Sequence, residues 1–323
     1  MKERIKSKQI ATKKSFGKRL IEDLGRNHTL YFMILPLVIY YLLFSYLPMV
    51  GVLIAFKDYR SVLGNSFLEN IIQSKWVGFD NFVKFFTSPS FWKVLRNTIN
   101  ISLQSILVGF PAPIILALLF NELRSMKYKK VLQTVTYLPH FISLVVVCGI
   151  IRAFTADDGI ITWVISHITG QEHSNMLLHS KYFVPILVWS DVWQGVGWGS
   201  IIYMSALAGV NEELYEAASI DGAGRFKLVW HITLPSILPT IAIMLILRLG
   251  SVLNVGYEKI LLLYNDLTKD VGEIISTYVY QRGLIGRDYS YSTAVNLFQS
   301  VINIIFLVSA NKISGRLTET SLW

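Results

Sequence analysis

The sequence is poor in cysteine and in charge. Its 323 residues include one cysteine, Cys148, so the chain can form neither an intrachain disulfide nor a cysteine metal cage. Charged residues make up 16% of the chain, against about 25% in a typical globular domain. Hydrophobic residues make up 53% and gather in long blocks. This composition excludes a disordered chain, a coiled coil, collagen and a conventional soluble enzyme.

Several catalytic signatures are also missing. The sequence has no G-x-x-x-x-G-K-[ST] phosphate loop, no H-E-x-x-H and no G-x-S-x-G, so it offers no nucleotide cradle, zinc helix or serine nucleophile of those kinds. The glycine-rich run Gly195–Gly199 lies inside an apolar block, where close helix packing is its expected role. His167, His173 and His179 are irregularly spaced, which favours solvated side chains. We therefore predict no catalytic residue and no metal site.

Six apolar blocks dominate the chain, and each is close to the roughly 20 residues that a membrane-spanning helix needs. The first follows a basic stretch but is too long for the apolar region of a signal peptide, so we predict a retained helix. The six blocks are Leu30–Phe56, Ile99–Phe120, Val131–Phe154, Phe183–Val210, Ile237–Gly256 and Ala294–Ala310. They predict an all-α integral membrane protein with six transmembrane helices.

The distribution of positive charge predicts the orientation. With the N-terminus inside, 17 of the 30 lysines and arginines fall in cytoplasmic segments and 11 in outer loops, and the cytoplasmic segments are shorter. The positive-inside rule then places both termini and the 211–236 loop in the cytoplasm. We read residues 1–29 as a basic tail that sets this orientation rather than as a nucleic-acid or lipid-binding arm. A six-helix domain, 30–314, and a short tail, 315–323, follow.

The 211–236 loop carries the most information. Acidic residues open a first short helix, which suits the helix dipole, and Gly222 and Gly224 break it. A second helical turn from Arg225 gathers apolar side chains, and Pro235 is expected to end it. Two amphipathic helices at right angles between two spans make a projecting knob, which suits docking to a soluble partner.

The spacing within this loop resembles a known motif. Glu216-Ala217-Ala218, then Gly222 and then Ile232-x-Leu234-Pro235 resemble the EAA loop of ABC-transporter importer permeases. Asp221-Gly222-Ala223 resembles the carbohydrate-importer form of that loop. Other stretches resemble the MalF-like sugar permeases, and most of all an LplB-type subgroup associated with oligosaccharides and polysaccharide fragments; they are Tyr46–Pro48, Val77–Phe82, Arg96–Thr98 and Tyr137–Ser143.

This resemblance implies a type I ABC importer permease with the MetI-like fold, in a bacterial cytoplasmic membrane. Glu216 is then expected to contact an ATP-hydrolysing subunit, and Gly222 to permit the turn between two coupling helices. The remaining coupling residues implied are Ala217, Ala218, Asp221, Arg225, Leu234 and Pro235. The implied partners are a second permease subunit, two ATP-binding subunits, an extracytoplasmic solute-binding protein, an oligosaccharide and membrane lipid, but no nucleic acid. ATP and magnesium belong to a partner chain, so this chain is expected to bind no cofactor and to be no enzyme.

Polar side chains inside the last three blocks are candidates for the substrate pathway, because charges within a membrane usually face a cavity or a partner. They combine hydrogen-bonding groups with tryptophans on which sugar rings can stack, and an arginine suits the carboxylate of a uronic acid. The candidates are Trp189, Asp191, Trp193, Gln194, Trp198, Arg248, Asn254, Asn296, Gln299 and Asn303. Two structural readings stay open: Asp191 and Arg248 pair with each other or with a second permease subunit, or the stripe on the sixth helix holds helices together.

Two other functions compete with this one. In an ion-coupled secondary transporter, Asp191 and Arg248 would form the ion relay. An integral-membrane enzyme would need a convergent acid and base near one membrane surface, and the cytoplasmic loops supply none. The 211–236 loop argues against the carrier, because a carrier needs no dock for an ATPase.

Overall fold

The computed structural model describes residues 23, 25–62, 64, 66–170, 174–317 and 320–322, and these are almost entirely helical. Most of the predicted basic tail 1–29, part of the predicted tail 315–323, and His173 lie outside the described residues. The chain separates into two units, Met1–Leu53 and Ile54–Trp323. The predicted first membrane helix belongs mainly to the first unit, and the other five blocks belong to the second.

The first unit contains one long apolar helix. Helix α2, His28–Tyr41, continues as a π-helical turn, Leu42–Tyr46, and a 3₁₀ helix, Leu47–Phe56, which crosses into the second unit. The segment His28–Phe56 has 29 residues and contains an 18-residue window with a mean hydropathy of 2.1, which meets the length and composition of a membrane span. No side chain of α2 is buried within the chain, so its apolar surface is available to lipid or to another subunit.

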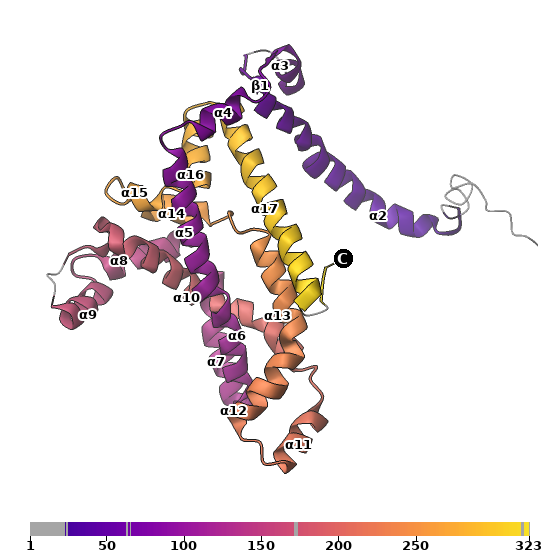
Figure 1. Ribbon diagram of the computed structural model, residues 1–323, viewed down its shortest axis with the longest axis vertical. Coiled ribbons are helices and arrows are strands. Elements are labelled where there is room, and N and C mark those ends of the chain that lie inside the picture. Colours follow the sequence, from indigo (N-terminus) through magenta and orange to yellow (C-terminus); the bar gives the residue numbers. More distant parts are fainter. Residues whose placement is uncertain are drawn as a thin grey trace, which may run out of the picture. The chain divides into compact units, whose positions relative to one another are not determined.

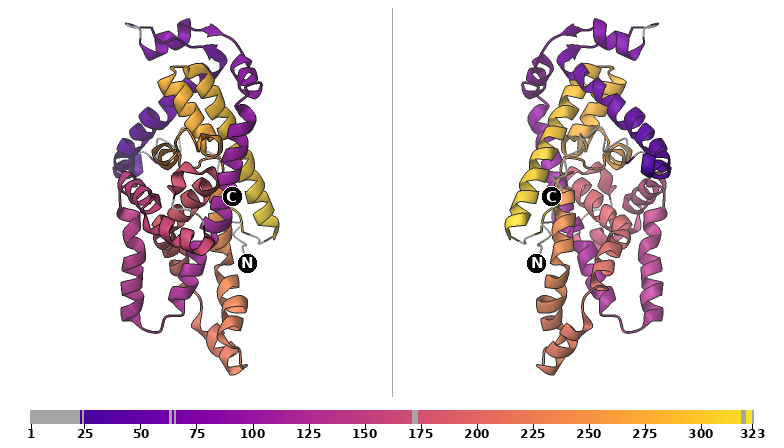
Figure 2. Two further views of the ribbon diagram at one scale, coloured as in Figure 1. Left: turned by 90° about the vertical axis from the view of Figure 1, so that its left-hand side faces the viewer. Right: turned by 90° about the vertical axis from the view of Figure 1, so that its right-hand side faces the viewer.

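The second unit is built from long helices (Figures 1 and 2). Among the described residues of both units, four helical segments are long and apolar enough to cross a membrane, and His28–Phe56 is one of them. A bent helix pair makes a fifth if it counts as one span. Helix α10 has 28 residues, about 42 Å at 1.5 Å per residue, but a more polar composition. The long helices are α5 Phe91–Gly109, α6 Pro111–Asn121, α7 Met126–Tyr137, α8 Leu144–Thr155, α9 Ile160–Thr169, α10 Ser180–Leu207, α13 Leu234–Leu249 and α17 Tyr289–Leu317.

The third apolar block is not one straight helix, and here the prediction of a continuous Val131–Phe154 span is wrong. Helix α7 passes into a 3₁₀ turn, Leu138–Phe141, and the segments on either side of the break, Met126–Phe141 and Leu144–Thr169, are bent by 100°. The break has a local cause, because Pro139 has no N–H to donate and the Ser143 side chain caps the start of α8, accepting from the Val146 N–H at 3.4 Å.

Helix α10 packs against α5, α6 and α13, and α17 lies beside α13 (Figure 1). The Gly195–Gly199 run lets the backbones approach closely, as predicted. A Cβ atom on Gly197 would lie 2.1 Å from the Thr136 carbonyl oxygen of α7, and one on Gly199 would lie 3.1 Å from the Pro113 ring of α6. Three apolar clusters fill the unit, and one of them joins α5, α8, α10 and α14 around Ile101, Val147, Leu187 and Ile260.

One end of the second unit is formed by the aromatic-rich residues 57–98. Strands β1 Lys57–Asp58 and β2 Lys75–Trp76 pair antiparallel, and helices α3 Phe67–Gln73 and α4 Asp80–Phe86 accompany them. Phe85 and Phe91 are buried against Tyr278, Tyr291 and Val295 of later segments, whereas Phe79, Phe86 and Trp92 are exposed.

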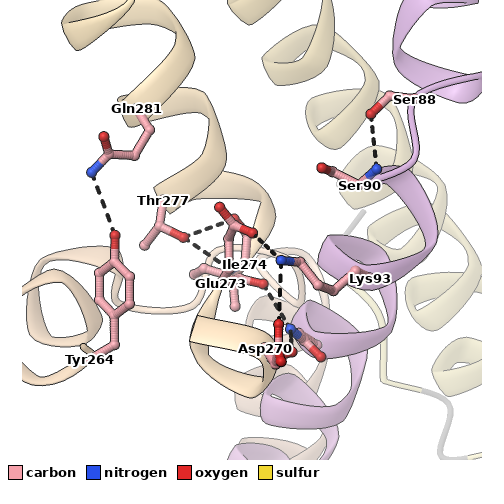
Figure 3. A network of polar contacts seen from close by, with 10 residues as sticks. Ser88, Ser90, Lys93, Tyr264, Asp270, Glu273, Ile274, Thr277 and Gln281 are labelled. Atoms are coloured by element: carbon pink, nitrogen blue, oxygen red, sulfur yellow. Dashed lines mark hydrogen bonds and ion pairs between the residues drawn. The ribbon is translucent and has the colours of Figure 1, made fainter. Parts of the chain in front are cut away.

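Residues 257–288 lie between the fifth and sixth predicted blocks, where the sequence predicted an outer loop (257–293), and they are folded and partly buried. They form α14 Tyr257–Leu263, α15 Lys269–Gly272, α16 Ile275–Val279 and a π-helical turn, Tyr280–Ile285. A polar network fixes them to α5 (Figure 3): the Lys93 ammonium lies 2.7 Å from the Glu273 carboxylate, and the buried Asn97 amide donates to the carbonyls of Asp270 and Glu273 at 2.7 and 3.0 Å. The segment is therefore a built part of the helix bundle.

Candidate functional site

The predicted coupling loop begins with a capped helix, α11, Glu212–Ile220. The Asn211 side chain accepts a hydrogen bond from the Glu213 N–H at 3.0 Å, and Glu212 and Glu213 occupy the first turn. An N-cap and acidic residues at the start of a helix both stabilise it. The sequence therefore specifies α11 locally, as predicted from its acidic opening.

Gly222 ends α11 in a Schellman motif. Its φ of +79° lies in the left-handed region, which glycine adopts without a steric cost. The Ala223 N–H donates to the Ala218 carbonyl at 2.9 Å, and the Gly222 N–H donates to the Ser219 carbonyl at 3.1 Å, which are the two bonds that define the motif. The predicted turn at Gly222 is thus a helix cap that requires a positive φ.

The second helix of the loop differs from the prediction. Helix α12, Arg225–Leu228, does not stop at Pro235 but continues through a π-helical turn, Val229–Thr233, into α13. The π turn lies directly before Pro235, which stands in the first turn of α13, where its missing N–H is tolerated. Arg225–Leu249 is therefore one helical rod of 25 residues, about 37 Å long at 1.5 Å per residue.

Helices α11 and α12 project at one end of the second unit (Figures 1 and 2). The Tyr215 hydroxyl donates to the Thr233 hydroxyl at 3.0 Å, which fastens α11 to the rod. Glu216, Ala217, Asp221 and Arg225 are exposed, Ala218 is half-buried, and Leu234 packs against the cluster around Ile114, Leu207 and Ile237. Large apolar side chains stand in solvent beside them: Phe226 is 94% exposed, Ile220 86% and Trp230 68%. Such a patch on a projecting element is typical of a surface that contacts another protein or a membrane.

A polar cavity of about 850 Å³ lies between α10, α14, α16 and α17. Its wall carries hydroxyl and amide groups together with tyrosine rings, and it includes the pathway candidates Asp191, Asn254, Asn296 and Gln299. Pockets that hold small ligands measure about 300–1,000 Å³, so the volume suits a short saccharide segment.

A second cavity of about 530 Å³ adjoins the first and shares Asp191, Asn254, Val255 and Gly256 with it. The candidates Gln194 and Arg248 line it. Arg248 stands at the far end of the rod that begins at Arg225 in the coupling loop. Arg248 is exposed within the chain and makes no ion pair with any residue that the structure describes.

Asp191 forms an ion pair with Lys259 of α14, and not with Arg248 as the first structural reading had it. The Lys259 Nζ lies 2.6 Å from an Asp191 carboxylate oxygen. The Lys259 side chain is 4% exposed and that of Asp191 is 47% exposed. Sequence reasoning missed Lys259, because residues 257–293 were taken as an outer loop. Lys259 lies only three residues after Gly256, the end of the fifth predicted block, and this proximity was the available signal.

The polar stripe of α17 partly serves packing. The Gln299 amide donates to the Leu253 carbonyl at 2.7 Å and to the Asn254 side chain at 2.9 Å. Asn303 accepts from the Leu253 N–H at 3.1 Å and also donates to Asn254. These bonds hold the segment after α13 against α17. Asn296 and Gln299 reach the larger cavity as well, so the second structural reading and the pathway reading both apply to this stripe.

Comparison with known proteins decides the family. Residues 109–319 match the model of the binding-protein-dependent transport system inner membrane component. The chain is 47% identical to protein LplB of Bacillus subtilis (strain 168) over 301 residues, which cover 93% of this chain and 92% of that protein. The chain belongs to this permease family.

The permease is also similar to a second curated protein and to a solved structure. It is 42% identical over 315 residues to the polygalacturonan/rhamnogalacturonan transport system permease protein YteP of the same organism, covering 97% of this chain and 96% of that one. A chain in the crystal structure of a bacterial alginate ABC transporter, in complex with an alginate pentasaccharide-bound periplasmic protein, superposes with a TM-score of 0.85 at 41% identity. That match covers 94% of this chain and all of the other.

Family membership fixes the broad character of the molecule. It is a multi-pass inner-membrane protein with the type I ABC importer permease fold, as the sequence predicted. Permeases of this family are transport subunits, and they neither catalyse a reaction themselves nor bind a cofactor. Among the described residues, no group of three or more histidine, cysteine, aspartate or glutamate side chains could hold a metal ion.

The three tryptophan candidates of the permease do not line either of the two polar cavities. Trp189 and Trp193 line a separate apolar cavity of about 400 Å³ between α8, α9 and α10. Trp198 stacks on His140 with ring centroids 4.7 Å apart. His140 itself lines the smaller polar cavity. The structure thus brings together the polar candidates and separates the aromatic ones, and the cavity's rings are tyrosines that the sequence did not single out.

Proposed function

We propose that this permease forms half of the translocation pathway of an ATP-driven importer for an acidic oligosaccharide. The proposed partners are a second permease subunit, two ATP-binding subunits and an extracytoplasmic solute-binding protein. Both chain termini and the 211–236 loop face the cytoplasm in this proposal. The names of the similar proteins support the substrate class, since they concern polygalacturonan, rhamnogalacturonan and the acidic polysaccharide alginate.

One observation carries the proposal: the coupling loop and the cavity wall are parts of the same helix. The rod Arg225–Leu249 begins beside the Schellman turn at Gly222, and its last residues adjoin the smaller cavity through Arg248. Helix α10 ends at Leu207, four residues before the loop opens at Asn211, and it carries Asp191. A movement of the loop is therefore transmitted to two walls of the cavity with no flexible linker on the rod side.

In the proposed coupling role, exposed side chains of α11 contact an ATP-binding subunit. Glu216 stands on α11 with its carboxylate in solvent, close in sequence to the exposed Ile220. An acidic group amid an apolar patch suits a cleft on a soluble subunit, where the apolar side chains supply burial and the carboxylate supplies orientation. Ala217 and Ala218 keep the face of α11 small, so that the helix can approach closely.

The test is reconstitution. The permease is purified with its co-expressed neighbours, placed in lipid vesicles with the binding protein, and assayed for ATP-dependent uptake of a uronate oligosaccharide. We expect uptake to require ATP, and Glu216→Ala to reduce uptake while Lys227→Ala, a change of an exposed residue on the other side of the turn, has a smaller effect. Uptake that continues without any ATPase subunit would support an ion-coupled carrier and overturn the proposal.

A further inference from the structure

The Lys259–Asp191 ion pair stands where the two polar cavities meet. Asp191 lines both cavities, and Lys259 lines the larger one. The pair joins α10, which leads into the coupling loop, to α14. The pair therefore borders the region that the two cavities share.

The two partners differ in burial, and this difference matters. A buried ammonium group is costly unless a negative group accompanies it, so Lys259 demands an anion at its Nζ. Asp191 supplies one, but its own side chain is about half exposed. An ammonium group has three N–H donors, and among the described residues the Asp191 carboxylate is its one hydrogen-bond acceptor. Lys259 can therefore donate to a second carboxylate, or exchange one for another.

The surrounding wall suits a sugar ring that bears a carboxylate. Ser276, Thr293, Asn296 and Gln299 offer neutral hydrogen-bonding groups around the same cavity. The rings of Tyr257 and Tyr280, with centroids 6.4 Å apart, give it apolar faces. The cavity also contains the Glu258 carboxylate, whose side chain is exposed and so more strongly screened than the buried Lys259.

We propose that Lys259 is the specificity-determining residue for acidic saccharides, with a uronate carboxylate competing with Asp191 for its ammonium group. This inference rests on the proposed function and names the side chain behind the substrate class. Arg248 is a different case, because it stands exposed in the smaller cavity without an ion-pair partner among the described residues. Lys259, in contrast, already pairs with the Asp191 carboxylate, the same chemical group that a uronate ligand carries.

The experiment measures binding to the assembled importer in lipid nanodiscs without the binding protein. The probes are a galacturonate trisaccharide and its neutral methyl ester. We expect the wild type to bind the acid at least about tenfold more tightly than the ester, a difference of about 1.4 kcal/mol, which is within reach of one charge-assisted hydrogen bond. Lys259→Gln should abolish this preference, and Lys259→Arg should retain most of it. Asp191→Asn should tighten acid binding severalfold, because the competing carboxylate is gone.

A matched variant separates charge from structure. The double variant Lys259→Gln with Asp191→Asn keeps two hydrogen-bonding amides in place of the ion pair, so it guards against misfolding caused by one unpaired buried charge. Equal preference for the acid in wild type, Lys259→Gln and the double variant would overturn the proposal, even if the importer takes up uronates. Lack of ATP-dependent uptake of any saccharide by the wild type would instead overturn the proposed function. A wild type that takes up the acid but binds acid and ester equally also overturns the role of Lys259.

Discussion

Gly222 offers the sharpest test of the coupling loop. An alanine at a φ of +79° costs about 1–2 kcal/mol, because its Cβ atom meets the following carbonyl oxygen. No atom outside the local turn lies within 4 Å of the new Cβ, so the cost is purely conformational and the rest of the fold is not disturbed. A penalty of that size lowers the population of the capped α11 end by a factor of about 5–30. We expect Gly222→Ala to lower ATP-dependent uptake strongly, and bulkier residues to abolish it, with normal membrane insertion.

Two matched variants make the test specific. Gly222→Asn should recover much of the activity, because asparagine tolerates the left-handed region better than alanine does. Gly224→Ala should be close to wild type, since Gly224 has a φ of −73° and no atom within 4 Å of an added Cβ. Uptake and ATPase rates are measured in the same vesicles. Normal uptake by Gly222→Ala, or an equal loss in Gly224→Ala, would refute the argument from backbone conformation.

Two further predictions concern the packing of the bundle. Gly197→Ala places a Cβ 2.1 Å from the Thr136 carbonyl oxygen, so α10 and α7 must separate; the melting temperature of the purified complex should fall, whereas Gly195→Ala, with no atom within 4 Å, should leave it unchanged. Asn97→Ala removes the donor to the Asp270 and Glu273 carbonyls and should cost about 1–3 kcal/mol per unsatisfied group; hydrogen exchange in residues 269–277 should speed up. Unchanged melting in the first case, or unchanged exchange in the second, would contradict these contacts.

The membrane helices that could be predicted from the sequence are those that coincide with a long run of apolar residues. Apolar runs of the right length set α2, α5 with α6, and α17. The observed helices Phe91–Asn121 and Tyr289–Leu317 extend the predicted blocks by a turn or more, whereas His28–Phe56 begins two residues before its predicted block. The extension has a physical reason: a helix continues into the polar interface beyond the apolar stretch as long as caps and propensity allow. The acidic first turn and Gly222 likewise specified α11 without tertiary contacts.

The errors arose where tertiary contacts override local signals. Pro235 reads as a helix stop, but a π turn before it lets the rod continue. The 257–288 segment reads as a polar loop. However, Lys93 of α5 pairs with the Glu273 carboxylate, and the side chains of Asn97 and Thr98 form hydrogen bonds with its backbone. These contacts offset the cost of burying the polar groups. The sequence of 257–288 gives no indication of those partners, because they lie more than 150 residues away in the chain.

The same reasoning explains why the site was only half predicted. A charge inside an apolar block, such as Asp191, can be recognised from sequence, because its cost implies a cavity or a partner. Its partner cannot be recognised when it lies in a segment of ordinary polarity, as Lys259 does. The sequence therefore favoured Arg248, a charge within the next predicted block, whereas the fold selects a lysine that α14 buries. Because Lys259 forms this pair, we expect the selectivity for a negatively charged saccharide to depend on Lys259 of α14 rather than on Arg248 of the rod Arg225–Leu249. Specificity for an acidic ligand would then reside on a segment fixed to α5, while movement is transmitted through α10 and α13. This division of labour predicts that variants of Lys259 change which saccharide is bound, and that variants of Gly222 change whether binding is turned into transport.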